Sequence, residues 1–270
     1  MGRFRGKGAN SFRLSKKIST FPAHCGMNEE VEVDHVDFDG KGVLITAEMN
    51  CHIFIRDSRL IGETIVQSNG MHVDLSIENS KLIATKSVLQ MEEMGGKVLI
   101  KNKSILESQD VAVLLGVNAQ LEVRNSQLSG KVSGAHLETN AKVQIFEDSL
   151  VQGGEVGLSM GVNGEAKLDH SRVSSKENAI KTAGNASLYL SNQSRVDAKE
   201  TAILAESNPH FSIRDSVVES DRDAIVGGFA ASIEVRNATV TATRYAFWFK
   251  SKPYKFLTSE TTVKGAYKNQ

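Results

Sequence analysis

The stretch "LEVRNSQLSG", from Leu121 to Gly130, recurs in altered form along the whole chain. Near-copies begin at Leu75 ("LSIENSKLIA"), Phe211 ("FSIRDSVVES") and Ile233 ("IEVRNATVTA"). In each copy apolar residues alternate with polar ones, which is the period of a β-strand, and a polar cluster interrupts the alternation. The repeat therefore predicts short strands separated by sharp turns.

The copies follow one another with a steady period. Eleven copies align on the position of Ser126, which we call the anchor, and successive anchors lie 22 to 24 residues apart. The anchors are Val36, Ser58, Ser80, Ser104, Ser126, Ser149, Ser171, Ser194, Ser216, Ala238 and Thr261. No linker interrupts residues 31–265, so these residues form one repeat domain. Residues 1–30 are then a basic N-terminal arm or cap, and residues 266–270 a C-terminal tail.

Each copy has room for three short strands but for no helix. Two alternating apolar residues precede the anchor, another follows it, and a third segment such as "AILA" (Ala202 to Ala205) closes the copy. A crossover helix between parallel strands needs more residues than this, so each strand must pair with its equivalent one copy later. We predict an all-β fold, a parallel β-helix (solenoid) of about eleven coils, roughly 50 Å long at the usual strand spacing.

Copies such as "LYLSNQSRVDAKETAIL" (188–204) run through a strand, an Asn-bearing turn, a strand, a polar turn and an Ala-Ile strand. This order resembles that of the right-handed, pectin-lyase-like β-helix superfamily, and the resemblance covers nearly the whole chain without indicating a particular member. It implies right-handed coiling and a cell-surface or secreted location. The first 28 residues contain no apolar run of the kind found in signal peptides, so the sequence itself does not assign a compartment.

The residues around the anchor suit a structural role. Asp or Asn precedes the anchor in six copies, where a sharp bend requires residues that tolerate the left-handed region. These residues are Asp57, Asn79, Asn125, Asp148, Asp215 and Asn237. We expect the anchor hydroxyls to bond the backbone of adjacent coils. Eight serines in a row are not expected to be nucleophiles, because nucleophilic catalysis needs one serine beside one base.

The composition excludes several partners. The chain carries 32 basic and 32 acidic residues, so no net charge attracts it to nucleic acid or to anionic membranes. No apolar run approaches the roughly 20 residues that span a bilayer. The first 28 residues contain no acid, and we interpret them as a basic arm in which Leu14, Ile18 and Phe21 form one face of a short capping helix, with a targeting signal as the alternative.

Neither the cysteines nor the histidines indicate a cofactor. Cys25 and Cys51 are too few for a disulfide-dense scaffold or a four-cysteine metal site, and Cys51 is expected to be a small buried apolar residue. The seven histidines show no metal-ligand spacing. We therefore expect neither a metal nor a cofactor.

The superfamily resemblance implies that an enzyme's groove would follow the sheet made of the Ala-Ile segments. The outward row of that sheet is expected to contain Leu114, Glu138, Ser159, Lys181, Leu204, Val226 and Trp248. A Ca²⁺ site needs six to eight oxygen ligands, and glycoside hydrolysis needs two carboxyl groups. A row with one carboxylate supplies neither, which argues against a lyase or a hydrolase.

An alternative catalytic site lies in the turns that lead into this sheet. Glu200, Asp221, Arg222 and Asp223, together with Lys181, could act as acid, base and sugar ligands. The simpler interpretation is that opposite charges one coil apart form surface ion pairs, each of small energy.

A contiguous apolar stripe is expected from Leu204, Val226 and Trp248, the only tryptophan. Such a stripe binds a sugar or a protein partner, or it is covered by another segment, for which residues 250–256 are the candidate. Our hypothesis is a non-catalytic rod, a glycan- or protein-binding, adhesive or structural module, whose oligomeric state the sequence does not indicate. The alternative is a carbohydrate-active enzyme: a polysaccharide lyase, hydrolase or epimerase.

Overall fold

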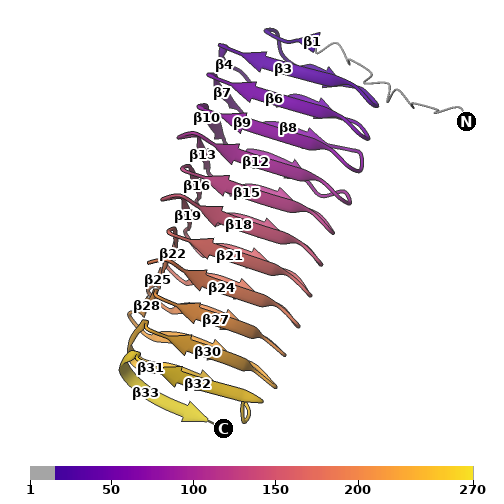
Figure 1. Ribbon diagram of the computed structural model, residues 1–270. Coiled ribbons are helices and arrows are strands. Elements are labelled where there is room, and N and C mark those ends of the chain that lie inside the picture. Colours follow the sequence, from indigo (N-terminus) through magenta and orange to yellow (C-terminus); the bar gives the residue numbers. More distant parts are fainter. Residues whose placement is uncertain (1–15, 270) are drawn as a thin grey trace, which may run out of the picture.

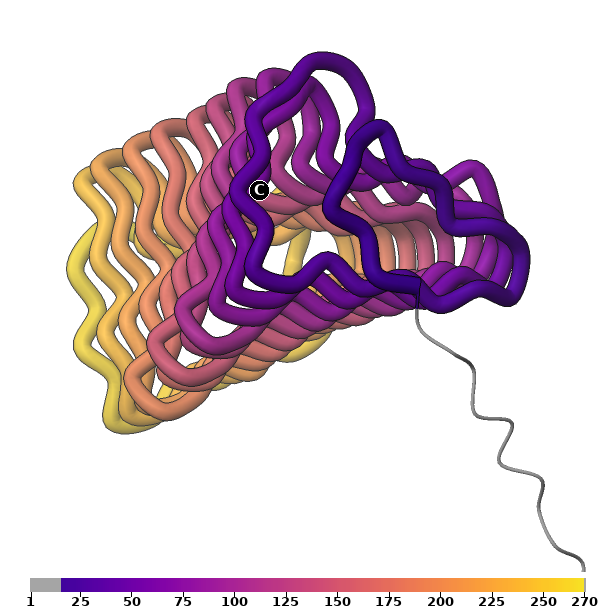
Figure 2. Tube along the Cα trace, turned by 90° about the horizontal axis from the view of Figure 1, so that it is seen from above, coloured from indigo at the N-terminus to yellow at the C-terminus, as the bar shows by residue number. Residues whose placement is uncertain are grey.

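A computed structural model describes residues 16–269, which contain strands and turns and no helix. Three-stranded coils stack on one another to form a rod (Figure 1). Seen along the stack, successive three-sided coils lie over one another (Figure 2). Each strand pairs in parallel with its equivalent in the next coil, as Leu121 does with Val143. The predicted parallel β-helix of about eleven coils is therefore confirmed.

The strands that precede the anchors form the first sheet. It has twelve strands, in the stacking order β1 (Lys16–Lys17), β3 (Glu30–Asp34), β6 (His52–Arg56), β9 (Asp74–Glu78), β12 (Lys97–Lys101), β15 (Gln120–Arg124), β18 (Lys142–Phe146), β21 (Glu165–Asp169), β24 (Ser187–Ser191), β27 (His210–Arg214), β30 (Ser232–Arg236) and β32 (Lys255–Ser259). This sheet faces the viewer in Figure 1.

The strands that follow the anchors form the second sheet. They are β4 (Asp37–Asp39), β7 (Arg59–Gly62), β10 (Lys81–Ala84), β13 (Ile105–Ser108), β16 (Gln127–Gly130), β19 (Leu150–Gly153), β22 (Arg172–Ser175), β25 (Arg195–Ala198), β28 (Val217–Ser220) and the first parts of β31 (Thr239–Phe249) and β33 (Thr262–Asn269).

The Ala-Ile segments form the third sheet. Its strands are β2 (Ala23–Cys25), β5 (Val43–Ala47), β8 (Thr64–Ser68), β11 (Leu89–Met91), β14 (Val111–Leu115), β17 (Ser133–Leu137), β20 (Val156–Met160), β23 (Asn178–Thr182), β26 (Thr201–Ala205), β29 (Asp223–Gly227) and the second parts of β31 and β33. Because β31 and β33 run through both sheets, the second and third sheets are one continuous set of 21 strands.

The core consists of rows of equivalent residues, one from each coil. The predicted inward rows of the first sheet are buried throughout, and Ile213 is fully buried between Leu190 and Val235. Burial of each such side chain contributes about 1.5–3 kcal/mol. The row of the second sheet begins at the partly buried Phe38, is buried from Leu60 to Val240, and ends at Val263, which is 44% exposed in the last coil. The predicted inward register is therefore confirmed.

The turn between the first and second sheets has the predicted structure. All six Asp and Asn residues before the anchors have positive φ, for example 42° at Asn125. The Ser126 hydroxyl donates to the carbonyl of Arg124 at 2.7 Å and accepts from the main-chain N–H of Ser104, one coil earlier, at 3.2 Å. The same anchor-to-anchor bond links Ser126 to Ser149 at 3.3 Å. Equivalent bonds join successive coils from Val36 to Ser149, which confirms the structural role there, whereas the hydroxyls of Ser171, Ser194 and Ser216 bond carbonyls of their own turns.

Two expectations for the N-terminal region are wrong. Residues 16–25 contain strands β1 and β2, not a capping helix: Ile18 is buried on the first coil and Phe21 packs against Phe38 with the ring centroids 4.7 Å apart. Leu14 lies outside the described residues. Cys51 is fully buried as expected, but it forms a disulfide with Cys25, with the two Cα atoms 6.0 Å apart, because pairing of β2 with β5 brings the two residues together.

The C-terminal boundary also differs from the expectation. Residues 266–269 belong to β33, which pairs with β31 up to Asn269, and so are not a tail. Phe256, in β32, packs against Phe247 and Phe249 of the preceding coil at centroid distances of 4.8 and 5.2 Å. Residues 250–256 therefore lead into the next strand of the first sheet, and they close the core there.

Candidate functional site

The first sheet presents a wider outward surface than the third sheet. In a first-sheet strand such as β15, only the second and fourth residues are buried, so three of five side chains reach the surface. In a third-sheet strand such as β26, only the fourth residue is not buried. Side chains that point out from adjacent strands of the first sheet therefore form several parallel rows, whereas the third sheet offers one row at the fourth position and, in strands such as β14 and β20, a partly exposed first residue.

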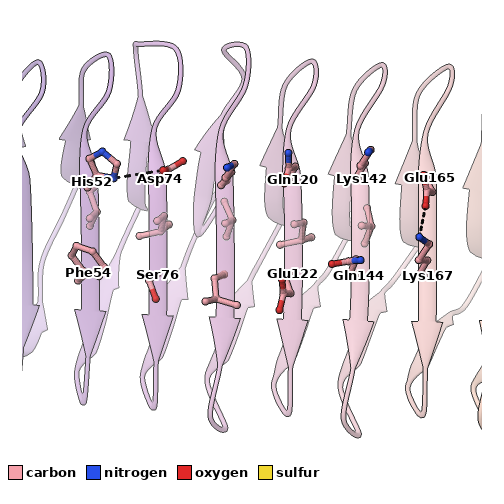
Figure 3. Close-up of a pocket in the computed structure, with 17 residues that line it drawn as sticks. His52, Phe54, Asp74, Ser76, Gln120, Glu122, Lys142, Gln144, Glu165 and Lys167 are labelled. Atoms are coloured by element: carbon pink, nitrogen blue, oxygen red, sulfur yellow. Dashed lines mark ion pairs between the residues drawn. The ribbon is translucent and has the colours of Figure 1, made fainter. Parts of the chain in front are cut away.

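A groove of about 470 Å³ crosses the outward face of the first sheet over six consecutive strands, β6 to β21. Two rows of side chains line it (Figure 3). The row from the first strand position contains His52, Asp74, Lys97, Gln120, Lys142 and Glu165, and the row from the third position contains Phe54, Ser76, Leu99, Glu122, Gln144 and Lys167. The groove runs across the strands, along the rod.

Charges are paired at both ends of the groove. His52 Nδ1 lies 3.6 Å from Asp74 Oδ2 at one end, and Lys167 Nζ lies 2.8 Å from Glu165 Oε1 at the other, as the dashed lines in Figure 3 mark. The hydrogen bond to Glu165 raises the pKa of the Lys167 ammonium above its ordinary value. At each end of the groove the opposite charges of these pairs contact each other. The side chains that are free to bind a ligand therefore lie in the middle of the groove.

The middle of the groove holds polar side chains with free hydrogen-bonding capacity. Lys97, Gln120 and Lys142 are exposed, and none makes a side-chain hydrogen bond or ion pair with another described residue. The main-chain groups beneath them are already bonded to neighbouring strands on both sides. Any ligand in this groove must therefore bond side chains and pack against Phe54 and Leu99.

Sequence analysis did not identify this groove. Its residues are the polar members of the alternation that predicts the strands, such as Gln120 and Glu122 in "QLEVR". The available signal is the presence of Phe54 and Leu99 at positions that are otherwise polar. That signal is weak, because isolated apolar residues are common on protein surfaces.

Three of the predicted catalytic residues, Glu200, Arg222 and Asp223, lie in a network of ion pairs. Asp223 is almost fully buried and accepts two hydrogen bonds from Arg244, one of them from Nε at 2.8 Å. These bonds raise the pKa of the Arg244 guanidinium. Glu200 pairs with Arg222 at 2.5 Å, one coil away. Both carboxylates are thus held by cations, in agreement with the ion-pair interpretation.

Asp221 and Lys181 lie apart from this network. Asp221 lines a separate groove over the second sheet, beside Lys199 and the pair formed by Arg172 and Asp197. The two hydrogen bonds from Arg172 to Asp197, at 2.7 and 2.8 Å, raise the pKa of the guanidinium. Lys181 stands on the third sheet between Ser159 and Leu204. The five residues are not brought to one cleft.

The expected outward row of the third sheet needs one correction. His136, not Glu138, pairs with Leu114 and Ser159, so Glu138 follows the strand rather than belonging to the row. The cause of the error is that the expected row was placed two residues, or one alternation, too far along the chain in that coil. His136 Nε2 lies 3.3 Å from Glu138 Oε1 in an exposed pair.

The apolar stripe is narrower than expected. Leu204, Val226 and Trp248 are in register, but Val226 is only 2% exposed, because its short side chain ends below those of its two neighbours. Trp248 is half-buried, and Lys268 Nζ and the Arg244 guanidinium lie 4.7 and 5.7 Å from its ring centroid. The expectation of three contiguous exposed apolar residues is therefore wrong at Val226.

One cluster on the described surface has metal-ligand chemistry. Ligand atoms of Asp34, His35 and Asp57 lie within 4.8 Å of one another. His35 Nδ1 is 2.8 Å from Asp34, and its Nε2 is 4.0 Å from Asp57. The histidine spacing could not reveal this cluster, since it depends on contact between successive coils. Arg59 and Lys81 line the same hollow, which disfavours a cation there.

The family model described as "Right handed beta helix region" matches residues 111–262, more than half of the chain. The chain therefore belongs to the right-handed β-helix family, as the repeat and the coiled sheets indicate. Comparisons with curated proteins and with solved structures gave no significant match. Among residues 16–269 no helix long and apolar enough to cross a membrane occurs.

Proposed function

We propose that the chain is a non-catalytic rod that binds an extended glycan in the groove across the first sheet. The observation that carries the proposal is the row of unpaired polar side chains, Lys97, Gln120 and Lys142, at equivalent positions of successive coils. These groups repeat at about the 4.8 Å strand spacing. A polymer that lies along the rod could therefore meet similar partners several times.

The state of the backbone favours a glycan over an extended peptide in this groove. Peptides commonly bind sheets by adding a strand to a free edge, which satisfies the main chain of both partners. The strands of the groove have neighbours on both sides, so no free edge exists there. Hydrogen bonds must come from side chains, which suits a ligand rich in hydroxyl groups, while Phe54 and Leu99 offer apolar contact.

The non-catalytic part of the proposal is supported by the carboxylates of the groove. Asp74 contacts His52, Glu165 contacts Lys167, and Glu122 accepts a hydrogen bond from Arg124. A glycoside hydrolase needs one carboxyl group kept as an acid and a second as base or nucleophile across the same bond. Carboxylates that each contact a basic side chain are poorly suited to act as the acid.

A glycan array combined with a release assay tests this function. The full chain is applied to immobilised glycans, and each retained glycan is then incubated with the chain while unsaturated and reducing sugars are measured. We expect saturable binding to an extended glycan without release of sugar. Sugar release at a rate proportional to chain concentration would show an enzyme, and the absence of any retained glycan would contradict the glycan-binding role.

A further inference from the structure

The turns from the third sheet into the first carry a line of exposed apolar side chains. The residue three positions before each first-sheet strand forms the tip of the turn. The tips are Met27, Met49, Met71, Met94, Val117, Thr139, Val162, Gly184, Ser207 and Phe229, followed by Lys252 in a longer last turn that also holds Tyr254. Six of the ten exposed large apolar residues of the described chain are tips, and a seventh is Tyr254.

Hydrogen bonds between successive turns hold these tips in line. The N–H of Asn28 donates to the carbonyl of Met49 at 3.1 Å, and equivalent bonds continue along the stack to the one from Asn208 to Phe229, at 2.7 Å. The tips therefore form a continuous edge of the rod, on the right in Figure 1. We call this edge the tip ridge. Isolated apolar residues need no explanation on a surface, but a contiguous row indicates an interaction site.

The N-terminal half of the tip ridge is acidic. Glu29, Glu48, Glu92 and Glu93 lie beside the methionine tips and are exposed. Within residues 16–269 none of them pairs with a lysine or an arginine; Glu48 lies 3.4 Å from His24 and accepts a hydrogen bond from the main-chain N–H of Met27 at 3.1 Å. Carboxylates elsewhere on the rod commonly have such partners. The methionine tips are therefore bordered by uncompensated negative charge.

The C-terminal end of the tip ridge is basic and aromatic. Phe229 is 61% exposed and Tyr254 is 86% exposed, the highest value among the large apolar residues described. Lys250 and Lys252 are exposed in the same last turn, and neither has a carboxylate partner in the described part of the chain. The two ends of one ridge are therefore opposite in charge, and both are apolar.

We propose that the tip ridge is the interface of an antiparallel, side-by-side dimer of this chain. A two-fold axis at Thr139 places the acidic methionine half of one copy against the basic aromatic end of the other, twice. Met49 then faces Phe229 of the second copy, while Met71 and Met94 face the small residues Ser207 and Gly184. Methionine side chains adapt readily to such surfaces. The chain carries no net charge that would oppose association.

The size of the ridge fits a stable interface. Eleven coils at the strand spacing extend roughly 50 Å. A standard interface buries about 800 Å² on each partner, which a strip of this length provides at a width of about 16 Å. A basic peptide would match only the acidic half of the ridge, whereas a second copy in antiparallel orientation matches both halves at once. The observations therefore favour a second copy.

Sedimentation velocity of the full chain over a range of concentrations tests the proposal through charge exchange. One double variant, Glu48→Lys with Glu93→Lys, leaves two acidic and two basic side chains in the N-terminal half and so cancels its negative charge, and the other, Lys250→Glu with Lys252→Glu, makes both halves acidic. We expect a dimer of the unchanged protein that weakens as salt is raised. Each double variant alone should dissociate with a Kd at least tenfold higher, and an equimolar mixture of the two should restore the dimer.

The matched control is Glu155→Lys with Glu177→Lys, which makes the same change in charge in the turns between the second and third sheets. Its dimer should have a Kd within twofold of the unchanged protein's, and thermal melting should show that all three variants fold. A protein that stays monomeric at all concentrations would overturn the proposal. Equal weakening by the control, or a mixture that remains monomeric, would overturn it as well.

Discussion

The first and third sheets are built from the same repeat, yet they differ in how much of each strand reaches the surface. In β15 of the first sheet the exposed and buried residues alternate, so that three of five point outward. In β26 of the third sheet Thr201, Ala202 and Ile203 are all buried, and only Leu204 among its five residues is partly exposed. The first sheet accordingly has a groove that extends over six strands along the rod, whereas the third sheet has its main outward row at the fourth strand position.

Crowding at the corner before the third sheet explains the difference. From β14 to β29 the second residue of each third-sheet strand is alanine or glycine, as in Ala179, Ala202 and Ala224, and is buried. At Gly157, in the same row, a Cβ atom would lie 2.7 Å from the carbonyl oxygen of Ala179. Strand alternation alone therefore predicts the surface of the first sheet but not that of the third, where the corner turns an additional residue inward.

The largest expected effect concerns the inward register that both sheets share. Ile213→Asp places an unpaired carboxylate in the closed core and should destabilise the fold by about 4 kcal/mol or more. The matched control is Ser212→Asp, at the adjacent outward position, which should change stability by less than about 0.5 kcal/mol. Chemical denaturation measures both. If the two variants lost similar amounts of unfolding free energy, the assignment of inward and outward positions in the first sheet would be wrong.

A second substitution tests the crowded corner directly. Ala202→Leu adds a branched side chain to the filled row of the third sheet and should cost about 1–3 kcal/mol. Ser159→Leu makes a comparable enlargement at the outward position of the same sheet and should cost much less. Thermal melting compares the two. If Ala202→Leu were tolerated as well as Ser159→Leu, the third sheet would have the same open alternation as the first.

The turn that leaves the first sheet provides a smaller effect. Asn125 has a φ of 42°, so Asn125→Val forces a β-branched side chain into the left-handed region, at a cost of about 1–2 kcal/mol. Gln127→Val, at an exposed strand position two residues later, is the control and should be nearly neutral. Denaturation midpoints measure the difference, and equal midpoints would contradict the strained turn.

Most of the fold could be predicted because each coil repeats the same information. A misread residue in one copy is corrected by ten others: the inward rows and the left-handed turns are as predicted, and the anchor hydroxyls join successive coils from Val36 to Ser149. The errors in strand assignment fall at the two ends of the rod, and one error of register falls within it, at Glu138. The disulfide between Cys25 and Cys51 lies in the incomplete first coil, where no equivalent pair exists for comparison.

The surface could be predicted less well, since it depends on side-chain length and on contacts between coils. Val226 is in register with Leu204 and Trp248 but is shorter, so it is buried between them. The partner that holds Asp223 is Arg244, in the next coil, and the charge pattern of one copy does not indicate which neighbour a carboxylate contacts. The sequence thus predicts which side chains point outward, but it does not predict how exposed each of them is or which charged residue it contacts.

The central claim is that ligand binds across the first sheet, and calorimetry with the best glycan from the array tests it most directly. We expect Gln120→Ala with Lys142→Ala to weaken binding at least tenfold, about 1.4 kcal/mol. The control pair His210→Ala with Ser232→Ala, in the same row beyond the groove, and Trp248→Ala on the third sheet should each change affinity less than twofold. Unchanged affinity in the groove variant together with a tenfold loss in Trp248→Ala would contradict the claim and assign the ligand to the third sheet.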